Sequence, residues 1–303
     1  MESIRNTIET LASKSVKNTV RDFWIGMAEK SRRKLKDGDY RDENGLAICG
    51  VCGKPMEERR MTKLEDGEGL DLIFGVWCDC DRAEDEKRKA EQKEREAKRI
   101  ANSMRESSLM DKRLMDARFE TSEVNAENEK QFKIAQRYVN KWETIEKVNQ
   151  GILFWGLPGT GKSHLAACIA NALIDKGVRT IMTSCIRLTD LILNSEVGET
   201  EILGRINRAR LLILDDVGTE RLTEYSIERI YSIVDSRYRA CKPLIVTTNL
   251  TLDEMKSGDD LQMGRIYSRI LEMCYPIKCT GKGFRRKATA ERYAMAKKLL
   301  EED

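Results

Sequence analysis

The chain has 303 residues, long enough for one substantial core and a smaller module, and its 54 Lys and Arg nearly cancel its 51 Asp and Glu to a net charge of +3. Composition therefore does not by itself indicate a nucleic-acid-binding protein. No apolar run approaches the roughly 18 residues of a membrane-spanning helix, and the N-terminus lacks the apolar core of a signal peptide. We therefore expect a cytoplasmic protein without a membrane partner.

The N-terminal segment, residues 1 to about 37, has apolar side chains at helical spacing, among them Phe23, Trp24 and Met27. An amphipathic helix there would most simply pack on the cysteine-bearing module that follows it. Aromatic and methionine side chains are also typical anchors of helix-in-groove recognition, so the helix is a candidate for binding a partner protein as well.

Residues 45–82 carry two close cysteine pairs, Cys49 with Cys52 and Cys78 with Cys80, with 25 residues between the pairs. A C-x-x-C turn presents two thiolates to one ion and a second pair completes a tetrahedral site, which predicts a structural zinc ion. A redox-active C-x-x-C is the alternative, but no thioredoxin-like βαβ pattern surrounds it. The remaining five of the nine cysteines are expected to be buried free thiols: Cys168, Cys185, Cys241, Cys274 and Cys279.

Residues 83–106 are rich in charge and have almost no apolar stripe. This pattern predicts a solvated helix with i,i+4 charge pairs, or a stiff linker. We therefore expect three parts: a partner-binding N-terminal domain over residues 1–82, with its helix and zinc module, a charged linker over 83–108, and a nucleotide-binding domain over 109–303.

From about residue 109 onward, strand and helix patterns alternate. The expected strands are Ile152–Trp155, Arg179–Thr183, Leu211–Asp215, Pro243–Thr248 and Tyr275–Cys279. The expected helices are Leu165–Lys176, Ile186–Asn194, Glu201–Asn207 and Tyr225–Arg239. Such alternation implies right-handed βαβ crossovers and an α/β fold, with a parallel five-stranded sheet covered by helices on both faces.

A phosphate-binding loop follows the first of these strands. Gly156–Ser163 fits the pattern G-x-x-x-x-G-K-[ST] and precedes an amphipathic helix, which is the context this motif requires. Lys162 would neutralise the β and γ phosphates, and the Ser163 hydroxyl would hold Mg²⁺. The residues expected to contact the nucleotide are Gly156, Pro158, Gly159, Thr160, Gly161, Lys162, Ser163 and His164. The sequence therefore predicts binding of a nucleoside triphosphate.

Polar residues end two further strands, at the sheet edge where open α/β sheets bind ligands. Asp215 is expected to orient Mg²⁺, and Asp216 to polarise the water that attacks the γ-phosphate. Asn249, after the next strand, is placed to hold that water.

Together these segments resemble the AAA+ ATPases, and within them the helicase loaders of the DnaC/DnaI type and the closely related IstB-type transposition helper ATPases. The resemblance covers residues from about 109 to 287 and is carried by Gly156–Ser163, Asp215–Glu220, Ile230–Arg239, Val246–Asn249, Gly264–Ile270 and Gly283–Arg285. The stretch Asp39–Pro55, with Cys78 and Cys80, resembles the N-terminal zinc module of loader-like proteins of phages and related bacterial elements.

The resemblance implies ATP as the nucleotide, a replicative DNA helicase as the partner of the N-terminal region, contact with single-stranded DNA, and self-association through the nucleotide sites. It also assigns two arginines. Arg269 matches the arginine finger that such proteins insert into a neighbour's site, and Arg285 matches the second sensor arginine, with Arg265 and Arg286 as their competitors.

Two features imply a weak ATPase that works as a switch. Asp216 is one methylene shorter than the Glu that AAA+ enzymes at large have at this position. The segment after the fifth strand has room for one helix, Ala288–Glu301, but not for a full helical lid. The basic residues around Phe284 are a candidate contact for DNA phosphates and a stacked base.

Three alternatives stay open. A transposase helper shares the same core. A small-molecule or nucleoside kinase shares the phosphate loop but gives Val246–Asn249 and Arg269 no required role. A non-enzymatic interaction module, in which ATP only sets the conformation, is compatible with Asp216.

Overall fold

The computed structural model of the protein describes residues 20–63, 69–194, 198–218, 223–257, 261–281, 293, 295–297 and 299–301. The chain divides into two compact units, Met1–Arg95 and Glu96–Asp303. The division falls inside α2 (Asp79–Glu106), a single helix that contains the charged segment.

The first unit joins a helix, residues 20–31, to two antiparallel hairpins. β1 (Tyr40–Arg41) pairs with β2 (Ala47–Ile48), and β3 (Glu57–Lys63) pairs with β4 (Gly69–Gly75). Trp24 of the helix lies edge-on to Phe74 of β4 with 6.5 Å between the ring centroids, so the helix packs on the second hairpin. The rest of the predicted N-terminal helix, residues 1–19, lies outside the described residues.

Glu57, the first residue of β3, connects the helix to both hairpins. Its side chain is fully buried and accepts hydrogen bonds from the side chains of Arg41 (2.8 Å) and Arg32 (3.4 Å) and from the backbone N–H groups of Arg33 and Ala47 (both 3.1 Å). Burial alone would raise the pKa of this carboxyl, but the two arginines and the two N–H groups together lower it to about 2. The carboxylate is therefore a buried, fully paired centre of the first unit.

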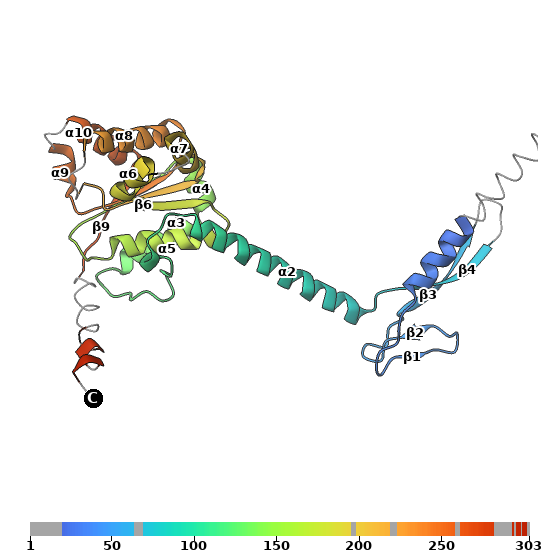
Figure 1. The fold of residues 1–303 in the computed structure, drawn as a ribbon. Helices are drawn as coiled ribbons and strands as arrows, with labels where there is room; N and C mark the ends of the chain where they lie inside the picture. The colour runs from blue at the N-terminus through green and yellow to red at the C-terminus, as the bar shows by residue number, and fades with distance from the viewer. Residues whose placement is uncertain are drawn as a thin grey trace, which may run out of the picture. The chain divides into compact units, whose positions relative to one another are not determined.

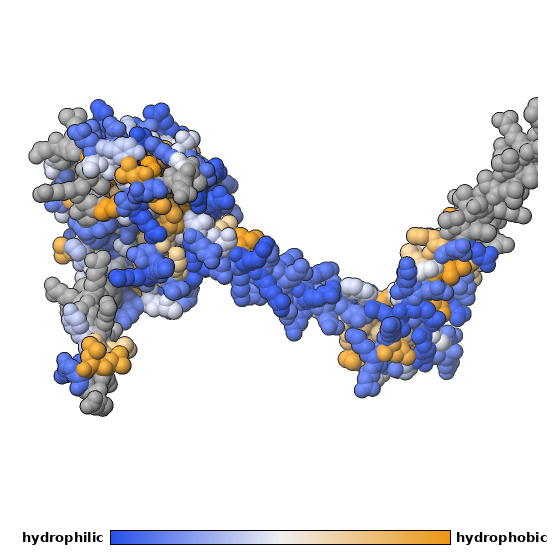
Figure 2. Space-filling model, viewed as in Figure 1, coloured by the Kyte–Doolittle hydropathy of each residue, from blue (hydrophilic) through white to orange (hydrophobic). Residues whose placement is uncertain are grey.

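Most of α2 faces solvent. Figure 2 shows the middle of the helix as a hydrophilic surface, and ion pairs at helical spacing run along it, such as Lys89 with Asp85 and Arg99 with Glu96. The segment that the sequence predicts as a charged helix is helical throughout. Among the described residues, no helix is both long enough and apolar enough to cross a membrane.

The second unit is built on a parallel five-stranded sheet, as the alternating pattern predicts (Figure 1). The strand order is β6–β7–β8–β5–β9. The strands are β5 (Gly151–Trp155), β6 (Thr180–Ser184), β7 (Leu211–Asp215), β8 (Leu244–Thr248) and β9 (Cys274–Lys278), each within one residue of its predicted bounds. The first four residues of β7 are buried, in agreement with their continuous apolar run.

Helices cover both faces of this sheet (Figure 1). α3 (Glu129–Asn140) and α5 (Lys162–Asp175) pack on one face. On the other face lie α6 (Cys185–Asn194), α7 (Glu199–Arg208), α8 (Glu224–Arg239) and α10 (Leu261–Met273). Three short helices also belong to this unit: η1 (Lys112–Leu114), α4 (Trp142–Lys147) and α9 (Leu252–Ser257). The sequence predicted α5–α8 but not α3, α4, α9 or α10.

One of the five cysteine predictions was wrong. Cys241 is exposed, because α8 ends at Arg239 and Cys241 lies in the turn beyond it with a φ of 49°. The other four, Cys168, Cys185, Cys274 and Cys279, are buried free thiols as expected.

Candidate active site

The phosphate loop connects β5 to α5, and its glycines are required by its backbone. Gly156, Gly159 and Gly161 have φ values of 133°, 81° and 88°, a region that residues with a side chain rarely adopt. A Cβ on Gly156 would also lie 2.5 Å from the carbonyl oxygen of Cys279, which directly follows β9. Glycine thus allows both the tight turn and the close approach that place the loop at the N-terminus of α5, where backbone N–H groups and the helix dipole favour an anion.

Lys162, the first residue of α5, is buried and held by the loop and by β8. Its ammonium donates to the carbonyl oxygens of Gly156 (2.8 Å) and Leu157 (2.9 Å) and to Oδ1 of Asn249 (2.7 Å). The amide Nδ2 of Asn249 in turn donates to Oδ1 of Asp216 at 2.9 Å. Asn249 therefore links the phosphate-loop lysine directly to the acid at the end of β7.

The ends of β7 and β8 are joined through Thr247. Its hydroxyl donates to Oδ1 of Asp215 (2.6 Å) and accepts from the backbone N–H of Asp216 (2.9 Å). Asp216 needs this support because its φ is 60°, a strained value for a residue with a side chain. Burial raises the pKa of Asp215, and hydrogen bonds from Thr247 and Ser163 oppose the shift.

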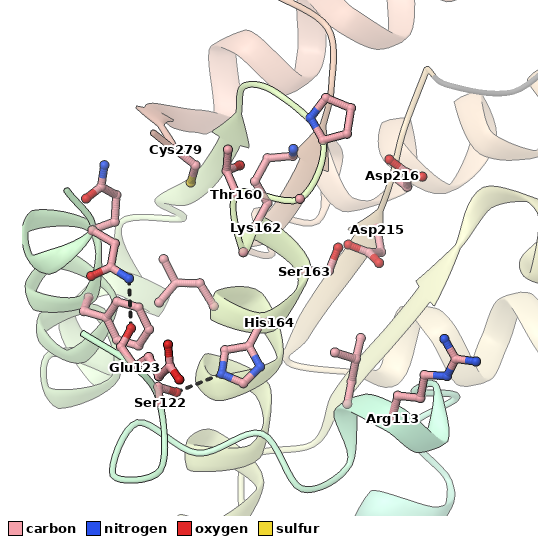
Figure 3. Close-up of a pocket in the computed structure, with 18 of the residues that line it drawn as sticks. Arg113, Ser122, Glu123, Thr160, Lys162, Ser163, His164, Asp215, Asp216 and Cys279 are labelled. Carbon is pink, nitrogen blue, oxygen red and sulfur yellow. Dashed lines mark hydrogen bonds between the residues drawn. The ribbon is translucent and has the colours of Figure 1, made fainter. Parts of the chain in front are cut away.

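The carboxylate of Asp215 and the hydroxyl of Ser163 lie side by side (Figure 3). Both are hard oxygen donors of the kind that Mg²⁺ prefers, and in nucleotide sites this ion usually keeps several waters and takes few protein ligands. The pair therefore fits a Mg²⁺ ion, whose positive charge would also favour the ionised form of Asp215.

A pocket of about 690 Å³ lies in front of the loop, a volume typical of small-molecule and cofactor sites. One side consists of the phosphate loop with Asp215, Asp216 and Asn249. The facing side includes several residues of the segment 111–123, which we call the opposite wall, and parts of α3. The pocket thus extends beyond the phosphate loop, and its volume also has room for the nucleoside part of a nucleotide.

The structure brings together ten of the predicted site residues, which all line or border this pocket: Gly156, Pro158, Gly159, Thr160, Gly161, Lys162, Ser163, His164, Asp215 and Asp216. Asn249 joins them. His164 is the one whose side chain turns elsewhere, since its ring bonds to Ser122 of the opposite wall (Figure 3).

Arg269 lies outside this pocket, on α10. Its guanidinium pairs with Asp235 of α8, hydrogen-bonds the hydroxyl of Tyr231 (3.1 Å), and lies 5.2 Å and 5.0 Å from the ring centroids of Tyr231 and Tyr238. Its competitor Arg265 is exposed on the same helix. The other predicted arginine, Arg285, with Arg286 and the basic cluster around Phe284, lies outside the described residues.

Two parts of the site were missed at the level of sequence. Thr247 was predicted only as part of a strand end, although its position two residues before Asn249 was the available signal. The opposite wall carries no motif, because its residues approach the loop through tertiary packing on α5.

The four paired cysteines of the first unit also converge. The sulfur atoms of Cys49, Cys52, Cys78 and Cys80 all lie within 4.8 Å of one another. A hydrogen bond from the Lys54 backbone lowers the pKa of the Cys52 thiol to about 6. The hydrogen bond between Cys52 and Cys80 raises the pKa of the Cys80 thiol to about 12. Such opposed shifts are expected where four thiols crowd together, because their negative charges repel unless a cation is bound. The S₄ set and its spacing fit a tetrahedral Zn²⁺, with Zn–S bonds of about 2.3 Å.

Comparison with known proteins agrees with this fold and site. The family described as IstB-like ATP binding protein matches residues 85–292. The replicative helicase loader DnaC of Escherichia coli (strain K12) is 32% identical over 125 residues, which is 40% of this chain and 50% of DnaC, so the chain spans half the length of that relative. The replicative helicase loader DnaI of Bacillus subtilis (strain 168) is 23% identical over 86% of this chain and 84% of DnaI. A crystal structure of DnaI superposes with a TM-score of 0.50 and 25% identity, covering 59% of this chain and 98% of that one. The resemblance to helicase loaders is thereby confirmed.

Proposed function

Since the chain belongs to the family of IstB-like ATP-binding proteins, we propose that it binds and hydrolyses ATP and uses this cycle to load a replicative DNA helicase. The observation that carries the ATPase part is the continuous hydrogen-bonded chain from Lys162 through Asn249 to Asp216. It connects the residue that meets the β and γ phosphates to the residue that acts on the attacking water.

Each residue of the chain has a defined task in this proposal. The loop N–H groups bind the phosphates, and Lys162 exchanges its loop carbonyl partners for phosphate oxygens. Asp216 accepts a hydrogen bond from the attacking water, and Asn249 fixes the orientation of the Asp216 carboxylate. Thr247 holds both aspartates in register. Mg²⁺, held by Ser163 and Asp215, would neutralise charge that develops on the phosphates.

For the first unit we propose a structural zinc ion and a partner-binding role. The Cys49, Cys52, Cys78 and Cys80 sulfurs would close the site completely, which suits a structural ion and leaves no position for a substrate. On the helix of this unit, Phe23 is 63% exposed and Met27 is 39% exposed, whereas Trp24 is directed to Phe74. Phe23 and Met27, one turn apart, are therefore the side chains that we assign to the helicase.

Self-association would bring Arg269 to a neighbour's nucleotide. To reach a neighbour's nucleotide, Arg269 must break its contacts with Asp235 and the two tyrosine rings. Otherwise α8 and α10 must move together and carry the arginine with these contacts intact. A transposase helper remains the second candidate, because the family match over residues 85–292 includes the IstB-type proteins.

The experiment that tests the proposal combines hydrolysis and partner capture. Full-length protein is assayed for ATP hydrolysis with and without single-stranded DNA, and for co-purification with the replicative helicase in ATP and in ADP. Hydrolysis together with helicase retention supports the proposal. Retention of a transposase in place of the helicase would favour the helper function, and phosphoryl transfer to a metabolite would indicate a kinase.

A further inference from the structure

His164 directly follows the Mg²⁺-binding serine, yet its ring faces away from Lys162 and Asp215 (Figure 3). Its Nε2 atom lies 2.8 Å from the hydroxyl oxygen of Ser122 in the opposite wall. The contact spans 42 positions of the sequence and joins the first turn of α5 to the part of the opposite wall that follows η1, which has no helix or strand. His164 is the only histidine of the chain, and neither the motif nor the proposed hydrolysis gives its ring a task.

The hydrogen bonds around Ser122 determine which atom donates. The Ser122 hydroxyl also contacts the backbone carbonyl of Arg118, which can only accept, so the single hydroxyl proton is used there. Toward His164 the Ser122 oxygen must then be the acceptor, and Nε2 of the ring carries the proton. Cys168 lies 3.6 Å away on the same helix, and burial raises the pKa of its thiol to about 11, so it too can donate to Ser122. The Ser122 hydroxyl thus donates one hydrogen bond and accepts two, and through the two that it accepts it connects the opposite wall to α5.

A second anchor holds the other end of the wall. Asn171 is fully buried on α5, and its Nδ2 donates to the carbonyl oxygens of Leu114 (2.9 Å) and Ala117 (3.0 Å). His164 and Asn171 are seven positions apart, which places them on the same face of the helix, two turns from each other. Two side chains of α5, His164 and Asn171, therefore hydrogen-bond the opposite wall to the helix that carries Lys162 and Ser163.

We propose that His164 is a positioning residue, which acts through Ser122 to hold the opposite wall against the nucleoside part of the bound nucleotide. This inference rests on the proposed nucleotide binding at the same site. With the phosphates on the loop, the remainder of the ligand extends into the part of the pocket that the wall and α3 enclose. The phosphate contacts come from the loop and from Lys162, and these do not depend on the His164 ring.

The test compares two ligands, ATP and inorganic tripolyphosphate, by calorimetry on the full-length protein. His164→Leu and Ser122→Ala are each expected to weaken ATP binding about fivefold to tenfold, the effect of one lost hydrogen bond that leaves a buried partner unpaired. Tripolyphosphate binding is expected to change less than about twofold, because it uses the loop alone. His164→Gln can place an amide N–H near the position of Nε2 and is expected to lose less ATP affinity than His164→Leu.

Ser107→Ala is the matched control, since Ser107 directly follows α2, its hydroxyl donates to the carbonyl oxygens of Ser103 and Met104 in the last turn of that helix, and the residue does not line the nucleotide pocket. It should leave both affinities unchanged. If Ser122→Ala weakened the binding of ATP and of tripolyphosphate equally, the proposal would be overturned, because the Ser122–His164 contact would then act on the phosphate loop. Unchanged ATP affinity in both His164→Leu and Ser122→Ala would overturn it too. If the wild-type protein bound neither ligand, the proposed nucleotide binding itself would be wrong.

Discussion

Replacing Glu57 by Gln tests whether the first unit depends on a single buried carboxylate. The pKa of Glu57 is about 2 in the fold against an ordinary value of 4.5, so the ionised form is stabilised in the folded state. The shift corresponds to about 3 kcal/mol at pH 7. Because the folded pKa is depressed, this stabilisation is present above about pH 4.5 and is lost as the pH falls toward 2, so that about half of it remains at pH 3.

The measurement is hydrogen exchange of the full-length protein, read by mass spectrometry on peptides of β3 and β4 and corrected for the intrinsic rate at each pH. At pH 7, Glu57→Gln should lower the opening free energy of these peptides by about 2–3 kcal/mol, because the amide keeps the shape but not the charge that Arg32 and Arg41 meet. The difference from wild type should shrink to about half at pH 3. Protonation of other groups affects both proteins alike and cancels in the comparison.

Glu58→Gln is the control, since Glu58 is the next residue on β3, carries the same charge and is 41% exposed at its side chain. It should change the opening free energy by less than about 0.5 kcal/mol. Equal effects of the two substitutions, or a Glu57→Gln effect that does not change between pH 7 and pH 3, would refute the reasoning.

Three further predictions concern the two binding sites. Lys162→Ala should abolish tight ATP binding in an equilibrium assay, because it removes the one ammonium held within the phosphate loop; wild-type affinity would contradict the assignment of the loop. Asp216→Asn should keep ATP affinity within about threefold while lowering the turnover rate by at least about 100-fold, because the amide no longer accepts the proton of the attacking water; equal loss of binding and turnover would show that the roles of the two aspartates are misassigned. Cys52→Ser should lower the zinc content from about one ion per chain, measured by elemental analysis, and should leave ATP binding by the second unit intact; a zinc-free wild-type protein with a Cys49–Cys52 disulfide would instead favour the redox interpretation.

Much of the second unit could be predicted because its signals are local. The strands are short apolar runs, so their bounds were correct to within one residue. The phosphate loop is defined by glycines whose positive φ values the motif already implies. The cysteine cluster could also be found from spacing alone, since each pair forms its half of the cluster within a few residues of chain.

What the sequence did not provide are the contacts between distant segments. Lys162 hydrogen-bonds to Asn249, 87 positions away, and Ser122 to His164, 42 positions away. Thr247 gains its function only because β8 pairs with β7 in the sheet, which brings its hydroxyl to Asp215, 32 positions away in the sequence. Cys241 illustrates the opposite error: its apolar character and its place next to a strand predict a buried thiol, but the helix before it ends two residues earlier and the side chain is exposed.

Arg269 shows how such distant contacts bear on mechanism. Motif position assigns it to a neighbour's nucleotide, whereas in the single chain it is paired with Asp235 and lies against two tyrosine rings. A partly buried ion pair and two cation–π contacts together stabilise this arrangement by an amount on the order of 1–3 kcal/mol. In the proposed self-association, a neighbour's site would have to stabilise the guanidinium by more than this amount, and the negative charge of bound triphosphate would supply that stabilisation. Assembly would then depend on nucleotide through Arg269 itself, because an empty neighbouring site has no bound phosphates to replace the ion pair of the guanidinium with Asp235.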